Sequence, residues 1–377
     1  MRHASVSSRR SPSDGNPSCR RRQDLLYTIM GVIGELLLTM AVVCALYVVW
    51  QLWWTGVESG RAQEQTRQSA SWSAPSSSAG TTVAKAQKGD PPVQPASATT
   101  DELIAEVYIP RFGSSWSRTI VQGTGLEQLA RHGLGHYTTS QMPGQVGNFA
   151  IAGHRSGYGQ PLGDIDKLRS GDSIIIRTKD YWYVYTYTSH EIVLPTEVRV
   201  ISSNPQNPAA KATKRLITMT TCTPKYVYAH APYRWIAYGE LKYWARVSDG
   251  IPKELASTDS SGKVSFVSSS AGSSVLYSMP SLDRLVAVAL VLYAVLAASA
   301  AVAWRWPALR SARDGRSPRG TGPYGWLLRM QPGVLPIRIL LVALLVVAGV
   351  AALFEWAFPW AASSIPYLQS MSNYVTV

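Results

Sequence analysis

One cysteine is the candidate nucleophile of this chain. The sequence has 3 cysteines: Cys19 in a basic N-terminal tail, Cys44 in a long apolar segment, and Cys222 in the globular middle. The apolar and β-branched run Leu216–Thr221 predicts a strand, and because Pro224 cannot donate to a ladder, the strand should end just past Cys222. If this middle region lies outside the cell, Cys222 has no disulfide partner there, so it is either a small packing residue or a nucleophile.

His154 and Arg234 are the candidate partners of this thiol. A nucleophilic cysteine needs a proton partner and a group that stabilises the developing oxyanion. His154 follows the short apolar run Gly147–Gly153 and should also lie at a strand end. Arg234 opens the next strand-like run after Cys222, so pairing of the two strands would bring its guanidinium near the thiol. Arg155 competes with Arg234, but adjacent strand residues face opposite ways, so Arg155 should point away if His154 points into the site.

The other histidines are weaker candidates for the proton partner. They are His3, His132, His136, His190 and His230. His230 is the main rival of His154, because it lies in the loop that follows the nucleophile. The sequence Ala229–Pro232 is typical of a mobile connector, however, which is a poor place to fix an imidazole.

The sequence gives no support for a metal site. His132 and His136 have a spacing that suits a metal on a helix, but glycines break that helix and no third ligand follows. Asp164 and Asp166 should cap or flank a short helix, and Asp172 should lie in a turn.

Three ordered motifs resemble those of a known family. Residues Gly147–Arg155 read Gly-Asn-Phe-Ala-Ile-Ala-Gly-His-Arg, residues 218–224 read Thr-Met-Thr-Thr-Cys-Thr-Pro, and Arg234 follows on the next strand. Together they resemble the catalytic motifs of sortases. Met219 stands where the family has leucine, a change that nearly conserves volume and should leave the fold intact.

The upstream sequence is similar to one branch of this family. The runs Ile109–Gly113 and Gly133–Tyr137 resemble those of actinobacterial class E sortases. The resemblance covers about Glu102–Leu241. It does not extend to the two apolar segments near the C-terminus.

The resemblance implies a cysteine transpeptidase that needs no metal or organic cofactor. Cys222 would attack the Thr-Gly carbonyl of a Leu-Pro-x-Thr-Gly or Leu-Ala-x-Thr-Gly sorting signal. His154 would act as acid and base, and Arg234 would hold the substrate and offset oxyanion charge. Thr221, next to the nucleophile, would add a hydroxyl contact, and Tyr137 is a candidate for the pocket at the second signal position. The partners would be surface proteins with a C-terminal sorting signal, an amine acceptor such as a peptidoglycan precursor, and membrane lipids.

Three alternatives use the same residues. A pilin-polymerising sortase commonly carries an Asp-Pro-Phe/Trp lid motif, and its absence from residues 55–100 favours cell-wall anchoring. A hydrolytic cysteine peptidase would use water as the acceptor. A membrane-anchored surface or signalling barrel would only bind.

Short strand signals predict a mainly β fold, a closed sortase-type β-barrel with short helices. Tyr183, Tyr185 and Tyr187 alternate with smaller residues, which is typical of a barrel face. The expected strands are Glu106–Ile109, Asn148–Gly153, Ser173–Arg177, Tyr183–Leu194, Arg215–Thr221 and Arg234–Leu241. The expected helices are Leu126–Arg131 and Ile165–Arg169.

Three apolar segments are long enough to cross a bilayer. They are residues 25–54, 285–304 and 337–360.

Residues 55–100 are rich in Ser, Ala, Gln and Thr with almost no large aliphatic residues, so they are expected to be a disordered tether. The predicted organisation is a basic cytoplasmic tail (1–24), a transmembrane helix (25–54), a disordered linker (55–100), an extracellular barrel domain (101–247), a linker (248–284), a second transmembrane helix (285–304), a basic cytoplasmic loop (305–336), a third transmembrane helix (337–360) and an extracellular tail (361–377).

The charge distribution argues for a membrane protein and against a nucleic-acid-binding one. The formal net charge is +13, but arginines cluster before the first apolar segment and between the last two. Basic residues that flank apolar helices indicate the cytoplasmic side. No zinc finger, Gly-rich phosphate loop or RNA-stacking motif is present in the sequence, so we expect no nucleic-acid partner.

Overall fold

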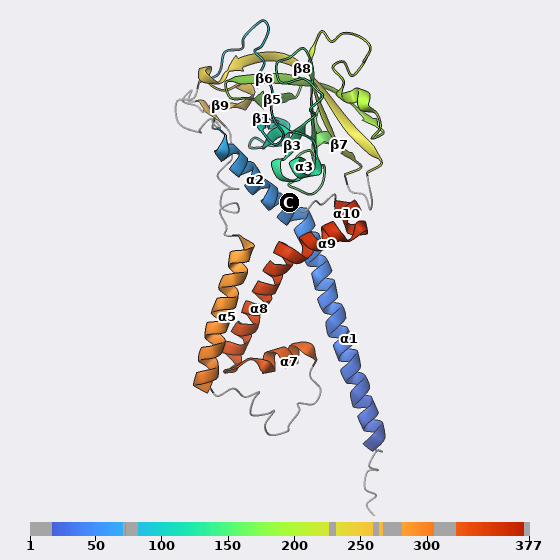
Figure 1. The fold of residues 1–377 in the computed structure, drawn as a ribbon, viewed down its shortest axis with the longest axis vertical. Coiled ribbons are helices and arrows are strands. Elements are labelled where there is room, and N and C mark those ends of the chain that lie inside the picture. The colour runs from blue at the N-terminus through green and yellow to red at the C-terminus, as the bar shows by residue number, and fades with distance from the viewer. Residues whose placement is uncertain are drawn as a thin grey trace, which may run out of the picture. The chain divides into compact units, whose positions relative to one another are not determined.

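The computed structural model describes residues 17–70, 72, 82–225, 231–258, 264–266, 281–304 and 322–372. The chain forms two compact units, one of residues 1–47 and 281–353, the other of residues 48–280 and 354–377. Figure 1 shows the elements of both.

The second unit contains a closed β-barrel with the strand order β1-β2-β3-β4-β7-β8-β6-β5. Its strands are β1 (Leu103–Tyr108), β2 (Ser117–Gln122), β3 (Leu134–His136), β4 (Gly147–Gly153), β5 (Ser173–Arg177), β6 (Tyr181–Val193), β7 (Arg215–Thr223) and β8 (Tyr233–Arg246). The predicted fold class is therefore confirmed. The sequence did not predict β2 or the very short β3, which pair in parallel with each other.

Alternate residues along β6 point to opposite faces of the barrel wall. Tyr183, Tyr185 and Tyr187 are 0%, 1% and 3% exposed and belong to the barrel core. Trp182 and Val184 point to the other face and pack in a second apolar cluster. The prediction that the tyrosine stripe is a barrel face is confirmed.

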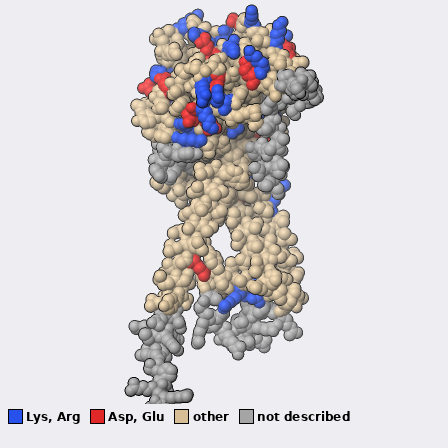
Figure 2. Space-filling view, turned by 180° about the vertical axis from the view of Figure 1, so that it is seen from behind, with Lys and Arg blue, Asp and Glu red and all other residues tan. Residues whose placement is uncertain are grey.

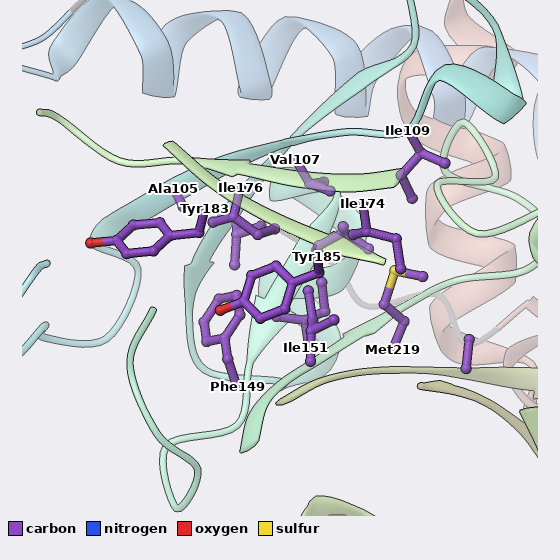
Figure 3. Packing of buried hydrophobic residues seen from close by; sticks show 14 of the residues in the cluster. Ala105, Val107, Ile109, Phe149, Ile151, Ile174, Ile176, Tyr183, Tyr185 and Met219 are labelled. Atoms are coloured by element: carbon purple, nitrogen blue, oxygen red, sulfur yellow. The ribbon is translucent and has the colours of Figure 1, made fainter. Parts of the chain in front are cut away.

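The strands that carry the candidate site are anchored in the same core. Phe149 and Ile151 of β4, Ile217 and Met219 of β7, and Ala237 of β8 all pack inside the barrel, and Figure 3 shows several of these side chains together. Met219 is fully buried, so this core accommodates it in place of leucine.

Short helices connect the strands. These are α3 (Leu126–His132) and the 3₁₀ turns η2 (Pro110–Phe112), η3 (Ile165–Lys167), η4 (Val198–Ile201), η5 (Val247–Asp249) and η6 (Lys253–Leu255). A small sheet follows, made of β9 (Ala256–Thr258) and β10 (Val264–Phe266).

The prediction of a disordered tether over residues 55–100 is wrong for much of its length. Residues Thr55–Ser69 form helix α2, which lies beside α3. Apart from Val57, the buried residues of α2 are small or polar, and several of them hydrogen-bond to the barrel domain. The sequence therefore lacks the apolar periodicity by which such a helix would be predicted. Residues 82–100 also contact the barrel, for example through the Tyr183 hydroxyl, which donates to the Pro92 carbonyl (2.8 Å).

The second predicted linker also begins later than expected. Ile251 is 1% exposed and Leu255 is 6% exposed, and both pack against Trp182 and its neighbours. Hydrogen bonds also hold this segment: the Ile251 N–H donates to the Thr82 carbonyl (2.9 Å), and the Trp182 Nε1–H donates to the Gly250 carbonyl (3.0 Å).

Three helices are long and apolar enough to cross a membrane, among the residues the structure describes. They cover Leu26–Ser69, Leu282–Trp304 and Leu335–Ser364. Their elements are α1 (Pro17–Val49), η1 (Trp50–Trp54), α2, α5 (Leu282–Trp304), α8 (Leu335–Ala352), η7 (Leu353–Ala357) and α9 (Phe358–Ser364). In the view of Figure 2, charged side chains gather on the barrel and are sparse on the long helices.

Two shorter helices complete the C-terminal region. Helix α7 (Pro323–Met330) lies in the predicted basic loop, whose residues 305–321 are outside the described part of the chain. Helix α10 (Pro366–Ser372) lies in the predicted extracellular tail. Within the first unit, the backbone N–H of Tyr324 donates to the Glu35 carboxylate (2.9 Å), which provides a partner for the internal charge of the first apolar helix.

Candidate active site

The strand register brings the three main candidate residues into one row. In the parallel pair β4–β7, the last paired residue of β4 is Ala152, which lies beside Thr220. His154 follows directly after the end of β4 at Gly153, so continuing this offset predicts that it lies level with Cys222. In the antiparallel pair β7–β8, Cys222 lies directly opposite Arg234. Residues that are neighbours across adjacent strands share a face of the sheet, so these side chains face the same side.

This row lies on the outer face of the barrel wall. Residues 149 and 151 of β4, 217 and 219 of β7, and 237 of β8 point into the core. Alternation along β7 and β8 then turns Cys222 and Arg234 outward, and it predicts the same direction for His154, one residue past the end of β4. We call these three residues the outer row.

The His154 imidazole is buried beside an aromatic ring. Its side chain is 7% exposed, and it stacks on Tyr158 with ring centroids 4.7 Å apart. Among the described residues, its Nε2 atom has no hydrogen-bond partner. Burial lowers the pKa of His154 to about 4, because desolvation disfavours the charged imidazolium. The imidazole is therefore neutral at pH 7 and able to accept a proton.

The thiol and the guanidinium are both partly exposed. Arg234 Nη1 donates to the backbone carbonyls of Ala231 (3.0 Å) and Tyr233 (3.1 Å), just before and at the start of β8. These bonds hold the arginine at the strand end opposite Cys222. Within the described residues, no hydrogen bond joins the side chains of the outer row to one another.

The opposite face of the same strand ends is tied together by polar contacts. Arg155 is 7% exposed, and its Nη1 donates to the Thr223 hydroxyl (2.6 Å) while Nη2 pairs with Asp166 (3.3 Å). The guanidinium also lies over the Trp235 ring, 5.1 Å from its centroid. Arg155 therefore points away from the outer row, as the alternation argument predicted. We call Arg155, Thr221, Thr223 and Trp235 the inner row.

Thr221 belongs to the inner row and not to the nucleophile's face. It is 3% exposed, and its hydroxyl donates to the Gly153 carbonyl (2.7 Å), which ties β7 to β4. Its hydroxyl is thus committed to the fold. The residue on the nucleophile's face is Thr220, whose hydroxyl bonds with that of Tyr137 (3.0 Å). The sequence reasoning missed Thr220, although strand alternation from Cys222 would have indicated it.

The other described histidines each bond to or stack on a neighbouring side chain. His136 is fully buried, bonds to Gln122 Oε1 (2.7 Å) and stacks on Phe149 (5.0 Å). Burial lowers its pKa to about 4. The remaining contacts are those of His132 with the Thr66 hydroxyl and of His190 with the Tyr187 hydroxyl and the Trp235 ring. His3 and His230 lie outside the described residues.

The described residues contain no group of three or more His, Cys, Asp and Glu that could hold a metal ion. Two of the acidic candidates are bound elsewhere. Asp172 accepts two bonds from the Arg111 guanidinium (2.8 and 2.7 Å), and Asp164 pairs with Lys167 (3.0 Å).

A left-handed turn follows His154 and was not predicted. Gly157, Tyr158, Gly159 and Gln160 have φ values of 67°, 49°, 73° and 48°. Tyr158 and Gln160 are not glycine, so neighbouring structure must hold them in this conformation. The sequence signal for the turn is the pair of glycines around Tyr158.

Comparisons with known proteins show which family this chain is similar to. Residues 107–242 match the family model of the sortase domain. The chain is 33% identical over 250 residues to sortase SrtE2 of Streptomyces coelicolor, an alignment that covers 64% of this chain and 94% of that protein. Among solved structures, it is similar to the SrtA sortase from Actinomyces oris (38% identity, 45% of this chain and 96% of that chain, TM-score 0.43). It is also similar to sortase E from Streptomyces avermitilis (37% identity, 42% of this chain and 99% of that chain, TM-score 0.38).

Proposed function

Since the chain belongs to the sortase family of cysteine transpeptidases and is class E-like, we propose that it is a membrane-anchored sortase that attaches proteins to a cell-wall amine. Its substrate is a sorting signal of the Leu-Pro-x-Thr-Gly or Leu-Ala-x-Thr-Gly type. The observation that carries this proposal is the outer row, in which one thiol, one imidazole and one guanidinium share a face at adjacent strand ends.

The first half of the reaction forms a thioester. The Cys222 sulfur attacks the threonine carbonyl while the neutral His154 imidazole takes the thiol proton. The carbon–nitrogen bond to glycine then breaks, and His154 returns that proton to the leaving amine. The signal up to threonine remains on Cys222.

The second half transfers the acyl group to the acceptor. An incoming amine attacks the thioester carbonyl, His154 removes its proton, and the carbon–sulfur bond breaks to release the thiolate, which takes that proton from His154. A new amide bond joins the protein to the acceptor. Burial supports this acid and base role, since it keeps the imidazole neutral before each attack.

Arg234 stabilises the negative charge that develops on the carbonyl oxygen. Its position opposite Cys222 supports this role, and a guanidinium presents several N–H groups in a fixed plane. Lysine would keep the charge but lose the planar donors, so the two residues are not equivalent here.

Tyr137 contributes to the pocket for the second signal position, next to Thr220. Its bond to the Thr220 hydroxyl supports this assignment, because Thr220 lies two residues from Cys222 on the same face of β7. Thr221 contributes through the fold, as its hydroxyl is bonded to Gly153.

The barrel lies outside the cell and the chain crosses the membrane three times. Three sufficiently long apolar helices support this arrangement. The arginines before the first segment and between the last two mark these regions as cytoplasmic. Membrane lipids are thus permanent partners, and substrates reach the site from the outer surface.

The test is product analysis with a peptide library and a panel of amines. The full chain in detergent should convert sorting peptides to amide products with an amine such as triglycine, and mass spectrometry should locate the new bond at threonine. Cys222→Ala should give none. Products that contain only free threonine carboxylate with every amine would contradict transfer and indicate a peptidase. Transfer by Cys222→Ala would contradict the whole assignment.

A further inference from the structure

We propose that Thr55 and Gly56, at the start of helix α2, position the His154 imidazole. They hold the left-handed turn 157–160, whose Tyr158 ring stacks on that imidazole. This inference rests on the proposed function, because it takes His154 as the acid and base. Under this proposal helix α2, which continues the first apolar segment, supports the active site. The sequence had predicted only a disordered tether in this region.

The contact between α2 and the turn is close and polar. The Thr55 hydroxyl accepts the backbone N–H of Tyr158 (3.1 Å) and donates to the Gln51 carbonyl (2.9 Å). Thr55 is 1% exposed, so both bonds are shielded from water. Residues 48–69 belong to the same compact unit as the barrel.

Gly56 allows the two backbones to approach each other. A Cβ atom at Gly56 would lie 2.9 Å from the Gly159 nitrogen and 3.0 Å from its Cα, closer than real Cβ contacts. Because the opposing atoms are backbone, an added methyl group would have to displace the turn. The first turn of α2 therefore fixes where the turn 157–160 lies.

The turn needs such support. Tyr158 and Gln160 have positive φ angles, which L-residues other than glycine adopt at a cost. The Gln160 N–H donates to the Gly157 carbonyl (2.7 Å), and the Leu162 N–H donates to the His154 carbonyl (3.0 Å). These bonds close the loop on itself. Two bonds come from outside it: the one to Thr55, and one from the Arg118 guanidinium to the Gly159 carbonyl (3.2 Å).

The turn transmits its position to the imidazole through Tyr158. The Tyr158 ring is 4% exposed and stacks on His154 at 4.7 Å with an interplanar angle of 29°. Among the described residues, His154 Nε2 has no hydrogen-bond partner that would orient the ring instead. A shift of Tyr158 should therefore shift the imidazole relative to Cys222, and small misplacements of a catalytic group lower the rate strongly.

The chain offers a matched control for Thr55. Thr66, also in α2, donates to the Ala62 carbonyl (2.8 Å) and contacts the barrel unit through His132 Nδ1 (2.9 Å). Both threonines thus bond to the carbonyl four residues earlier and to one group outside α2. Only Thr55 contacts the turn that carries Tyr158.

The experiment measures kcat, KM and the thermal midpoint of the full chain in detergent, with a Leu-Ala-x-Thr-Gly peptide and triglycine. Thr55→Val and Gly56→Ala should each lower kcat about tenfold with KM nearly unchanged. Thr55→Ser keeps the hydroxyl and should restore kcat. Thr66→Val should leave kcat unchanged even if it lowers the thermal midpoint as much as Thr55→Val.

The outcomes separate this inference from the proposed function. If Cys222→Ala is inactive but Thr55→Val and Thr66→Val have equal kcat, the positioning role is wrong and the proposed function stands. If Cys222→Ala retains transfer, the proposed function itself fails. Because valine is isosteric with threonine, Thr55→Val still gives a result if Gly56→Ala does not fold.

Discussion

The two faces of the same three strand ends differ in how their polar groups are used. In the inner row, Arg155 bonds to Thr223 and Asp166, and Thr221 bonds to Gly153. In the outer row, the side chains of His154, Cys222 and Arg234 make no hydrogen bond to one another among the described residues. One face stabilises the strand ends, while the other keeps its reactive groups available.

This difference shows why neighbours in the sequence have different roles. Arg155 follows His154 directly, and Thr221 precedes Cys222 directly. The side chains of Arg155 and Thr221 nevertheless point to the inner face, away from the outer row. Side chains that are bonded within the fold stabilise it, whereas side chains that are not bonded to one another can engage a substrate. Substitutions in the outer row should therefore affect rate, and those in the inner row should affect stability.

The largest expected effect is the loss of activity in Cys222→Ala. Without the thiol no thioester can form, so the rate of peptide transfer should fall by at least about 10⁴-fold. The thermal midpoint should change little, because Cys222 is partly exposed. The inner-row control Thr223→Val should instead lower the midpoint and retain transfer, and the reverse pattern would invalidate the division into two rows.

Arginine-to-lysine changes should separate the two guanidinium groups. Arg234→Lys should lower kcat about 10²-fold with little change in stability, because the planar donors near the oxyanion are lost. Arg155→Lys should retain most activity but lose about 2 kcal/mol of stability, since the bonds to Thr223 and Asp166 are weakened. Steady-state kinetics and urea unfolding of both variants measure this. Equal kinetic losses in both would show that the faces are not distinct.

The acid limb of the pH profile should lie below the ordinary histidine range. Burial lowers the pKa of His154 to about 4, so the imidazole remains unprotonated, and able to act as a base, at a lower pH than a solvated histidine. At pH 5.5, kcat/KM should be about tenfold higher than a pKa of 6.5 would allow. Measurement of kcat/KM from pH 4.5 to 8 tests this, and an acid limb centred at 6.5 or above would contradict it.

The smallest expected effect distinguishes two adjacent threonines. Thr221→Val removes the bond to Gly153 and should cost about 1 kcal/mol of stability without changing KM. Thr220→Val removes the bond to Tyr137 on the outer face and should change KM and the preference at the second signal position. Urea unfolding and a peptide library with varied second residue provide both measurements. A change in signal preference caused by Thr221→Val alone would reassign the pocket.

Local signals in the sequence were enough to predict much of the fold and the outer row. Period-two alternation, Pro224 after Cys222, and the strand-like run before His154 indicate strands that end at these residues. The shape of the turn after His154 and the role of α2 could not be predicted in this way. Both depend on the close approach of the Gly56 and Gly159 backbones and on one hydrogen bond between Tyr158 and Thr55. Neither contact leaves a periodic pattern of apolar residues in the sequence.

The sequence interpretation also did not assign the threonines near Cys222 to the two faces of β7. Thr221 was expected to add a hydroxyl contact because it adjoins Cys222. Alternation along β7 puts its side chain on the inner face, where it bonds to Gly153, and puts Thr220 on the face of Cys222. Strand β3 has only 3 residues, too few for a periodic signal.

The most direct test of the account is to trap the acyl-enzyme. The full chain is mixed with a Leu-Ala-x-Thr-Gly peptide without an amine, quenched in acid and analysed by intact-mass and peptide-mapping spectrometry. We expect an adduct with the mass of the signal up to threonine, joined through the threonine carbonyl to Cys222 and released by added triglycine. Cleavage of the peptide with no adduct on Cys222, or with the adduct on another residue, would contradict it.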